Sequence, residues 1–503
     1  MARDSYQVGF FAGEALERSA RNDPGKIALI AKDGEMSFAM VNEAVTRLAA
    51  HMQSEGVKQG DRVGLLLPNS LGFPLCYYAT QKMGAVTTVM DARLRGKELE
   101  RILQDGDLSL LITHRNLMPE IAQRLAAFEQ LPLWVVDGEG DVSLQKRLSS
   151  SPPAEFALPR LDPEQDALIL YTSGTTGEPK GVVLSYINLA QYPRVMAAMG
   201  MTSSTAVWGC ILPMSHIVGP VLCNDTAAKG CTTVIFDQIN PISLLEGIER
   251  HRVTIFPGVP AIFQLLLGVR NLRDYDTRSV QVAAMMGTTV PVSLMHAFKA
   301  AQPHIKVIQG YGLTETSPMI TLVELERADA KFGSIGRSVP GVEVRIVNEE
   351  GEDASEGEII TRGPHVMKGY FRKPQATAER IRDGWLYTGD VGRQDTDGYY
   401  YHLGRKDDMI ITGGLNVYPA EVEDVLCQHP GVLEAVVFPI PDPDRGNIIR
   451  ATVVPRPGEE VREKDLLSFL RSNLASFKVP QRIEVRESLP HTATGKIKRE
   501  TLG

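Results

Sequence analysis

The chain has 503 residues, of which 43% are hydrophobic and 23% charged, and its formal net charge is −8 at pH 7. This composition is that of an ordinary globular protein, and the length exceeds what one hydrophobic core normally supports, so we expect at least two domains. A net negative charge gives no electrostatic reason to expect a nucleic-acid partner. No stretch is apolar for long enough to cross a bilayer, which argues against integral membrane association.

The start of the chain does not resemble a signal peptide, because it carries acidic residues and lacks an uninterrupted apolar core. Five cysteines show no paired spacing of the metal-binding or redox kind: Cys76, Cys210, Cys223, Cys231 and Cys427. We interpret them as reduced packing residues and expect a cytoplasmic protein. The oligomeric state stays open, with a homodimer as one option.

In chain order, short apolar β-rich runs alternate with segments of helical period. The pattern predicts a helix within residues 36–57 and strands within 61–68, 232–237 and 281–286. Strands that alternate with helices favour a largely parallel sheet covered by helices. From about Gly333 the pattern changes to short alternating strands separated by Gly and Asp turns, which predicts a smaller antiparallel unit.

The last hundred or so residues predict a compact mixed unit. Helices are expected at 421–432 and 463–474, and strands at 434–440, 451–455 and 482–489. We therefore predict an α/β fold with two domains. A large N-terminal domain, 1–406, combines parallel helix-covered sheets with the small antiparallel β unit, and a small mobile α+β domain, 407–503, follows it.

The most informative pattern lies between Asp166 and Ser185. An apolar strand at 167–170 runs into Tyr-Thr-Ser-Gly-Thr-Thr-Gly-Glu-Pro-Lys-Gly at 171–181. Glycines let the backbone come close to a phosphate, hydroxyls donate hydrogen bonds and Lys180 supplies a positive charge. The spacing is not that of a Walker A loop. We expect a triphosphate cradle, against the alternative of a flexible turn between strand and helix, formed by Thr172, Ser173, Gly174, Thr175, Thr176, Gly177 and Lys180.

This string resembles the signature loop of the adenylate-forming superfamily, which includes acyl-CoA synthetases, aryl-CoA ligases, luciferases and the adenylation domains of peptide synthetases. Four more motifs follow in the order of that family. The resemblance implies that ATP activates a carboxylic acid as an acyl-adenylate with the help of Mg²⁺, and that coenzyme A accepts the acyl group. Transfer to a carrier protein, an amine or oxygen is the alternative acceptor reaction. A non-catalytic relative should have lost Glu315 or Lys496, and both are present.

Residues 309–316, Gln-Gly-Tyr-Gly-Leu-Thr-Glu-Thr, resemble the adenine and magnesium motif. By that resemblance Tyr311 stacks on adenine, Thr314 bonds the α-phosphate and Glu315 holds Mg²⁺. A later Tyr-Thr-Gly-Asp string is similar to the motif whose aspartate, here Asp390, accepts hydrogen bonds from both ribose hydroxyls. The alternatives are a solvated glutamate in a Gly-rich turn and an aspartate that caps a β-turn. The resemblance also assigns to the nucleotide Gly287, Thr288, Gly310, Gly312 and Arg405.

Three further assignments concern the small domain. Residues 404–410 resemble the family's hinge, where Asp407 would absorb the backbone rotation between two arrangements of that domain. The resemblance places Gly413 and Gly414, together with Phe477, beside coenzyme A. Lys496, in Thr-Gly-Lys-Ile-Lys-Arg, corresponds to the catalytic lysine, although a lone lysine in a polar tail would be solvated. The catalytic set is then Lys496, His216, Thr314 and Glu315.

Residues 213–219, Pro-Met-Ser-His-Ile-Val-Gly, resemble the segment whose histidine sits by the substrate carboxylate. A packed or solvated His216 is the alternative. Ser215 stands where the family usually has an aromatic, and 284–291 depart from the usual Gly-Gly-Ala-Pro-Leu-Pro. The acid pocket is expected to be apolar and lined by His216, Ile217, Val218, Phe256, Met286, Gly310 and Ser317. Because no obvious arginine would bind a second carboxylate, we favour an aromatic or aliphatic monocarboxylic acid.

Overall fold

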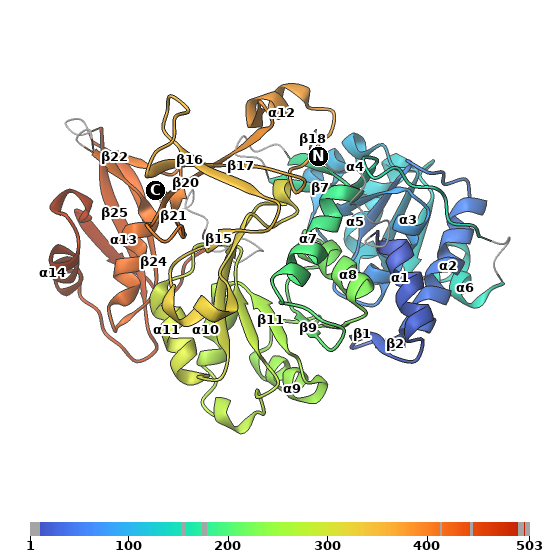
Figure 1. Ribbon diagram of the computed structural model, residues 1–503, viewed down its shortest axis with the longest axis horizontal. Coiled ribbons are helices and arrows are strands. Elements are labelled where there is room, and N and C mark those ends of the chain that lie inside the picture. Colours follow the sequence, from blue (N-terminus) through green and yellow to red (C-terminus); the bar gives the residue numbers. More distant parts are fainter. Residues whose placement is uncertain are drawn as a thin grey trace.

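The computed structural model of the chain describes residues 11–151, 156–173, 179–412, 415–442, 446–490 and Ile497. Figure 1 shows two large sheets with their helices at the middle and right, and the C-terminal unit at the left. The predicted α/β class is confirmed, with a separate antiparallel sheet and a C-terminal mixed unit. None of the helices in the described ranges has the length and apolar character needed to cross a membrane.

Nine of the described strands form the first sheet. Its order is β15 (Arg337–Ser338), β14 (Thr321–Leu322), β13 (Lys306–Tyr311), β12 (Val282–Met285), β11 (Ile255–Gly258), β9 (Val207–Cys210), β10 (Thr232–Ile235), β1 (Ile27–Ala31) and β2 (Gly34–Ser37). Neighbours from β13 to β1 are parallel, whereas the pairs at the two ends are antiparallel. The carboxyl ends of the parallel strands therefore lie along one edge.

Seven of the described strands form the second sheet. Its order is β18 (Gly369–Tyr370), β8 (Pro179–Ser185), β7 (Asp166–Ser173), β4 (Val86–Met90), β3 (Arg62–Leu66), β5 (Leu110–His114) and β6 (Leu133–Val136). Strands β7 and β8 pair antiparallel, with Thr172 opposite Lys180. The predicted phosphate loop thus joins two strands of a hairpin and does not lead from a strand into a helix.

Helices bury the faces of both sheets. One continuous core joins strands of the two sheets to α1 (Ala12–Asn22), α2 (Phe38–Ser54), α3 (Gly72–Lys82), α7 (Tyr186–Ala198) and α8 (Val218–Lys229). A second core packs the first sheet against α9 (Pro241–His251), α10 (Pro260–Leu267) and α11 (Val292–Ala301). A third packs the second sheet against α4 (Gly96–Gly106) and α5 (Met118–Leu125). Strands buried on both faces explain the nearly continuous apolar runs of the sequence.

The smaller sheet and the C-terminal unit follow. The smaller sheet consists of β16 (Glu343–Val347), β17 (Glu356–Arg362), β20 (Trp385–Gln394), β19 (Ile381–Arg382) and β21 (Tyr400–Arg405), with α12 (Pro374–Arg380) beside it. The C-terminal unit contains the hairpin β22 (Ile410–Thr412) and β23 (Leu415–Val417), then α13 (Pro419–Gln428), β24 (Val432–Asp442), β25 (Gly446–Pro455), α14 (Glu463–Asn473) and β26 (Arg482–Val485). Its core is separate from those of the large sheets.

The C-terminal unit touches the large unit at two helices. Asp424 in α13 accepts a hydrogen bond of 3.1 Å from the backbone N–H of Val292, the first residue of α11. Gln264 in α10 donates its side-chain amide to the carbonyl of Leu433 at 3.4 Å. A carboxylate at a helix N-terminus is favourable because it balances the positive end of the helix dipole. This contact therefore helps to hold the observed arrangement of the two units.

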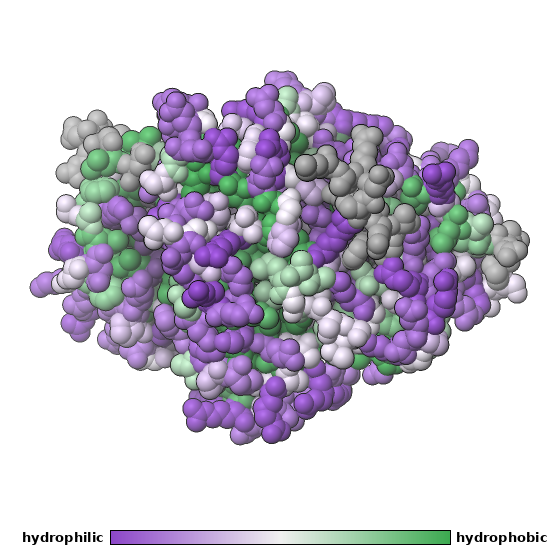
Figure 2. All heavy atoms as spheres, in the orientation of Figure 1, coloured by the Kyte–Doolittle hydropathy of each residue, from purple (hydrophilic) through white to green (hydrophobic). Residues whose placement is uncertain are grey.

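Hydrophilic residues predominate on the face shown in Figure 2. Hydrophobic residues also show at its upper left, the part of the view where β22 lies in Figure 1. Ile411 and Leu415, which flank the tip of the β22–β23 hairpin, are 49% and 47% exposed. Large apolar side chains at this exposure are candidates for contact with a ligand or partner.

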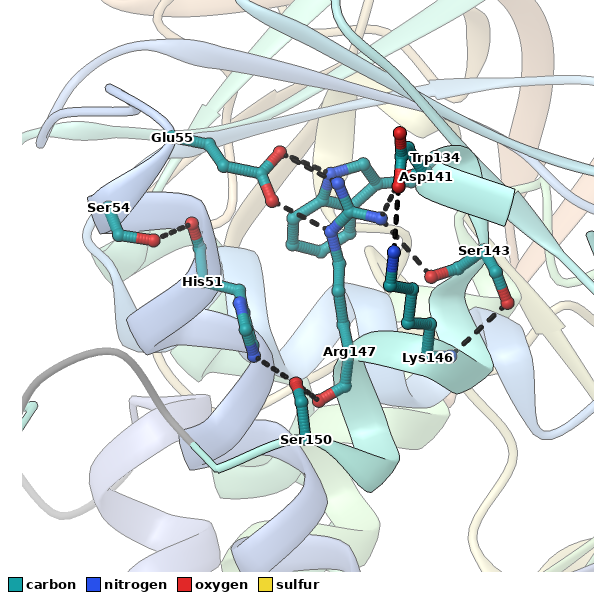
Figure 3. Close-up of polar contacts among 9 residues, drawn as sticks. All are labelled: His51, Ser54, Glu55, Trp134, Asp141, Ser143, Lys146, Arg147 and Ser150. Atoms are coloured by element: carbon teal, nitrogen blue, oxygen red, sulfur yellow. Dashed lines mark hydrogen bonds and ion pairs between the residues drawn. The ribbon is translucent and has the colours of Figure 1, made fainter. Parts of the chain in front are cut away.

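A buried tryptophan at the end of the second sheet is held by a carboxylate. Trp134 in β6 is fully buried, and its indole N–H donates to Glu55 at 2.8 Å. Arg147 lies over the indole ring, 4.5 Å from its centroid, and donates to both Glu55 oxygens at 2.8 and 3.0 Å (Figure 3). Glu55, just after α2, therefore links β6 to α6 (Leu144–Ser149), the helix that carries Arg147.

We predict that Glu55→Ala lowers the free energy of unfolding by about 1–3 kcal/mol, because a buried indole N–H loses its partner. Urea unfolding followed by tryptophan fluorescence measures the change. The control is Asp141→Ala, which removes the exposed ion pair with Lys146, leaves the Glu55 hydrogen bonds in place and should leave stability nearly unchanged. Equal stability of wild type and Glu55→Ala would show that water replaces the carboxylate at no cost.

Candidate active site

The assigned residues gather where parallel strands end. His216 follows β9, Gly287 follows β12, Tyr311 closes β13 and Asp91 follows β4 of the other sheet. In open α/β sheets, ligands bind beyond the carboxyl ends of the strands. The Nε2 atom of His216 lies 3.4 Å from an Asp91 oxygen, so these edges of the two sheets meet in space.

A buried carboxylate organises the side of the site next to the small sheet. Asp390 in β20 is 3% exposed. It accepts a hydrogen bond of 2.6 Å from the Tyr311 hydroxyl and pairs with Nε of Arg405 at 3.0 Å. His402 Nε2 lies 3.7 Å from the same carboxylate. Burial alone would raise the pKa of Asp390, but hydrogen bonding from His402 and the charge of Arg405 together hold that pKa below the ordinary aspartate value.

A second carboxylate lies beside the phosphate loop. Glu315, in the single turn Thr314–Thr316, accepts a hydrogen bond of 2.9 Å from the Tyr370 hydroxyl. The Lys180 ammonium lies 5.4 Å from the centroid of the Tyr370 ring. The structure brings the lysine of the predicted phosphate loop and the predicted metal ligand together at one tyrosine, with Glu315 at its hydroxyl and Lys180 over its ring.

The surroundings of Glu315 suit one magnesium ligand and do not suit an all-protein cage. Within the described ranges, no three His, Cys, Asp or Glu side chains cluster closely enough to hold a metal ion. Mg²⁺ is commonly bound by one or two carboxylates plus substrate phosphates. The donor set therefore fits a metal that arrives with ATP.

Three glycines in these turns are required for steric reasons. A Cβ at Gly312 would lie 1.4 Å from the Pro318 carbonyl oxygen, and a Cβ at Gly219 would lie 2.0 Å from the Met214 carbonyl oxygen. Gly287 has φ of +90°, a conformation that L side chains rarely adopt. The backbone beside the predicted nucleotide and acid residues can follow these paths only with glycine.

His216 is surrounded by charges that sequence reasoning missed. Its Nε2 lies 3.3 Å from an Nη2 of Arg93, and Arg93 also donates through Nε to Asp91 at 2.8 Å. Burial opposes ionisation of Asp91, but hydrogen bonds from Arg93 and His216 outweigh it and hold the pKa well below its usual range. Arg93 is 123 residues from His216, and its position just after an apolar strand was the available signal.

The predicted acid-pocket residues do not share one environment. Ile217, Val218 and Met286 pack in or against the core between the sheets. Phe256 packs in the other core, beneath α9 to α11, with its ring edge-on to Phe263 at 6.0 Å. Ser317 is 1% exposed, has φ of +58°, and its hydroxyl has no partner among the described residues. The role of each in acid binding stays a prediction.

Several assigned residues can be placed only in part. Thr172 is half-buried at the end of β7, Gly310 and Thr288 are half-buried, and Phe477 is 37% exposed. Other assigned residues lie outside the described residues: Gly174, Thr175, Thr176, Gly177, Gly413, Gly414 and Lys496.

Comparison with known proteins matches nearly the whole chain. Residues 16–371 match the model of the AMP-binding enzyme family, and residues 421–496 match that of the AMP-binding enzyme C-terminal domain. A long-chain-fatty-acid–CoA ligase of Bacillus subtilis is 34% identical over 97% of this chain and 93% of its own. A feruloyl-CoA synthase of an Amycolatopsis species is 35% identical over 95% and 96%. The solved structure of an anthranilate CoA ligase with anthranoyl-AMP superposes with a TM-score of 0.92 and 27% identity, covering 100% of this chain and 98% of that one. The resemblance stated from the motifs is confirmed.

The lowered pKa of Asp390 predicts how the free energy of unfolding changes with pH. A carboxyl whose pKa is lower in the folded chain stabilises the fold above its unfolded pKa, about 3.9, and loses that contribution as the pH falls through the folded value. We predict that wild type exceeds Asp390→Asn in unfolding free energy above about pH 5, and that the difference shrinks steadily below about pH 4. Urea unfolding at a series of pH values measures it.

Asp225 in α8 provides a control of opposite sign. It is fully buried, and burial raises its pKa to about 6, against hydrogen bonds from Trp208 and Thr202. Its contribution is present below the unfolded pKa and is lost as the pH rises through the folded value. For Asp225→Asn the difference from wild type should therefore shift the other way between about pH 4 and pH 6. The same trend in both variants would contradict the assignment at Asp390.

Proposed function

The chain belongs to the AMP-binding enzyme family, and we propose that it is an ATP-dependent carboxylic acid–CoA ligase that works through an acyl-adenylate. The observation that carries the proposal is that a lysine and two carboxylates of different kinds lie together at one edge of the sheets. A phosphate-loop lysine and a metal-type carboxylate flank Tyr370, and a buried acceptor-only carboxylate, Asp390, lies beside Tyr311. These are the groups needed to hold phosphates, their cation and a ribose.

The first step joins the acid to the α-phosphate of ATP and releases pyrophosphate. A carboxylate is a poor electrophile, so it must be activated before a thiol can attack it. Its own attack on ATP is opposed by repulsion between the two negative charges, so the site must neutralise charge and align the reactants. We assign neutralisation to Lys180, Lys496 and the loop hydroxyls, and alignment to Thr314. Mg²⁺ held by Glu315 would counter the charge of the phosphate oxygens.

Asp390 suits the ribose because its carboxylate has unused hydrogen-bond acceptor capacity. An ionised carboxylate offers about four acceptor positions. Tyr311 and Arg405 each occupy one, on different oxygens, and His402 lies 3.7 Å from the oxygen that pairs with Arg405. The low pKa keeps the group ionised, and therefore acceptor-only, at neutral pH. We assign the acceptor capacity that these partners leave to the ribose hydroxyls.

The second step passes the acyl group to the thiol of coenzyme A and releases AMP. Lys496 would obstruct the thiol, so we propose that the small domain, 407–503, rotates about Asp407 relative to 1–406. Asp407 is exposed in the turn between β21 and β22. Rotation would break the Asp424 contact with α11 and bring the β22–β23 hairpin, with Gly413 and Gly414, to the thiol side. The exposure of Ile411, Leu415 and Phe477 supports a role in contact with pantetheine.

The acid is proposed to be an aromatic or aliphatic monocarboxylate. Arg93 stands beside His216, but Asp91 accepts hydrogen bonds from two of its nitrogens. A guanidinium whose charge is paired in this way attracts a second substrate carboxylate less strongly. Of the relatives named above, one is named for a fatty acid and another for an aromatic acid, so experiment must decide between the two.

We also propose a reducing, cytoplasmic environment. All five cysteines are buried and unpaired with one another. Buried thiols without disulfides are expected where the compartment keeps thiols reduced.

A pyrophosphate-release screen tests the proposed reaction. A panel of fatty, aromatic and dicarboxylic acids is tested with ATP and Mg²⁺, with and without CoA. We expect turnover with one class of monocarboxylate, strongly stimulated by CoA. Pyrophosphate release that CoA does not stimulate, but hydroxylamine does, would indicate a different acceptor.

We predict that Lys496→Ala nearly abolishes acyl-adenylate formation and affects thioester formation from a supplied acyl-adenylate much less. The reason is that one lysine cannot occupy the phosphate side during adenylation and leave the thiol path open without moving. The two half-reactions are measured separately, with Lys498→Ala as the matched control. Equal losses in both half-reactions would refute the assigned role.

A further inference from the structure

We propose that Tyr370 is a positioning residue that sets the Glu315 carboxylate for the metal–nucleotide complex and, with the face of its ring, holds Lys180 at the phosphates. The inference rests on the proposed function and extends it to a residue that no motif singled out. Tyr370 interacts with both groups at once. Its hydroxyl donates a 2.9 Å hydrogen bond to Glu315, and its ring lies under the Lys180 ammonium, with 5.4 Å between the ring centroid and Nζ.

The backbone explains why one side chain reaches both groups. Strand β18 pairs antiparallel with β8, so Tyr370 lies opposite Val182, two residues after Lys180. The N–H of Phe371 donates to the Gly181 carbonyl at 2.7 Å. On the other side, the N–H of Met367 donates to the Glu315 carbonyl at 2.9 Å. Segment 367–371 is thus bonded to both the phosphate hairpin and the turn that carries Glu315.

The chemistry of tyrosine fits this position. A carboxylate only accepts hydrogen bonds, so the phenol must donate to Oε1, and this fixes the rotation of the carboxylate while Oε2 stays available. A cation over an aromatic face is attracted by the ring quadrupole. Tyr370 is 7% exposed, and a phenol has an ordinary pKa near 10, well above neutral pH. The hydroxyl therefore stays protonated as a donor.

A second tyrosine with the same chemistry provides a matched control. Tyr399 donates to Glu324 at 3.0 Å and carries the Lys331 ammonium 4.4 Å from its ring centroid. It is 1% exposed, so its burial resembles that of Tyr370. Neither Glu324 nor Lys331 is assigned to the nucleotide. Removal of the Tyr399 hydroxyl reports the general cost of such a change without the proposed role.

The experiment measures binding instead of turnover. Binding of Mn²⁺ to the full-length protein with ATP is followed by the electron paramagnetic resonance of free Mn²⁺, and ATP binding in excess EDTA by calorimetry. The variants are Tyr370→Phe, Tyr370→Leu, Glu315→Gln and Tyr399→Phe. Thermal unfolding verifies that each variant is folded.

We expect Tyr370→Phe to weaken Mn²⁺ binding by about ten-fold, the range for a lost hydrogen bond to a charged group, with metal-free ATP binding unchanged. Tyr370→Leu should also weaken metal-free ATP binding, because Lys180 loses the ring beneath it. Tyr399→Phe should change neither quantity.

The outcomes separate this inference from the proposed function. If Glu315→Gln weakens Mn²⁺ binding and Tyr370→Phe does not, Tyr370 has no positioning role and the metal assignment stands. If Glu315→Gln leaves Mn²⁺ binding unchanged, the metal assignment itself fails, and the inference fails with it. Equal ATP binding by the Phe and Leu variants would overturn the part that concerns Lys180. If Tyr370→Phe shows no thermal unfolding transition while Tyr399→Phe does, the Tyr370 hydroxyl is needed for folding and the proposal is overturned.

Discussion

The buried carboxylate of Asp390 is the interaction on which the rest of the site depends. An ionised carboxylate removed from water is costly unless hydrogen bonds and opposite charge satisfy it. Here the groups come from two sheets: Tyr311 lies in the first sheet, whereas Asp390 and Arg405 lie opposite each other on β20 and β21 of the small sheet. The two sheets must therefore be packed together before the carboxylate is stable. The same packing positions the residues that we propose to bind the nucleotide.

Much of this architecture could be predicted from sequence because its signals are local. Apolar runs and helical periods lie close to the strands and helices that form, such as 232–237 for β10 and 463–474 for α14. Adjacent residues, as in Thr314 and Glu315, also stay together in any fold. The motifs could thus be recognised without knowing how the sheets pair.

The remainder depends on contacts between distant segments. Arg93 and His216 are linked only because the edges of two sheets meet, and no local spacing encodes that meeting. Tyr370 reaches Glu315 because β18 adds to the second sheet, and a two-residue strand has no period to detect. The side of the sheet to which Phe256 points likewise depends on register, since alternate residues of a strand face opposite cores.

The position of the proposed hinge relative to these contacts has a mechanical consequence. Arg405 precedes Asp407 and is bonded to Asp390, and the Lys406 N–H donates to the Gly389 carbonyl at 2.8 Å. The chain is therefore tied to β20 up to the residue before the hinge, whereas Asp407 and Asp408 are exposed. Rotation that begins at Asp407 can carry away α13 and the β22–β23 hairpin without breaking the Asp390–Arg405 pair. The ribose contact would then persist through both steps, so that the adenylate stays bound while the groups around its acyl carbon are exchanged.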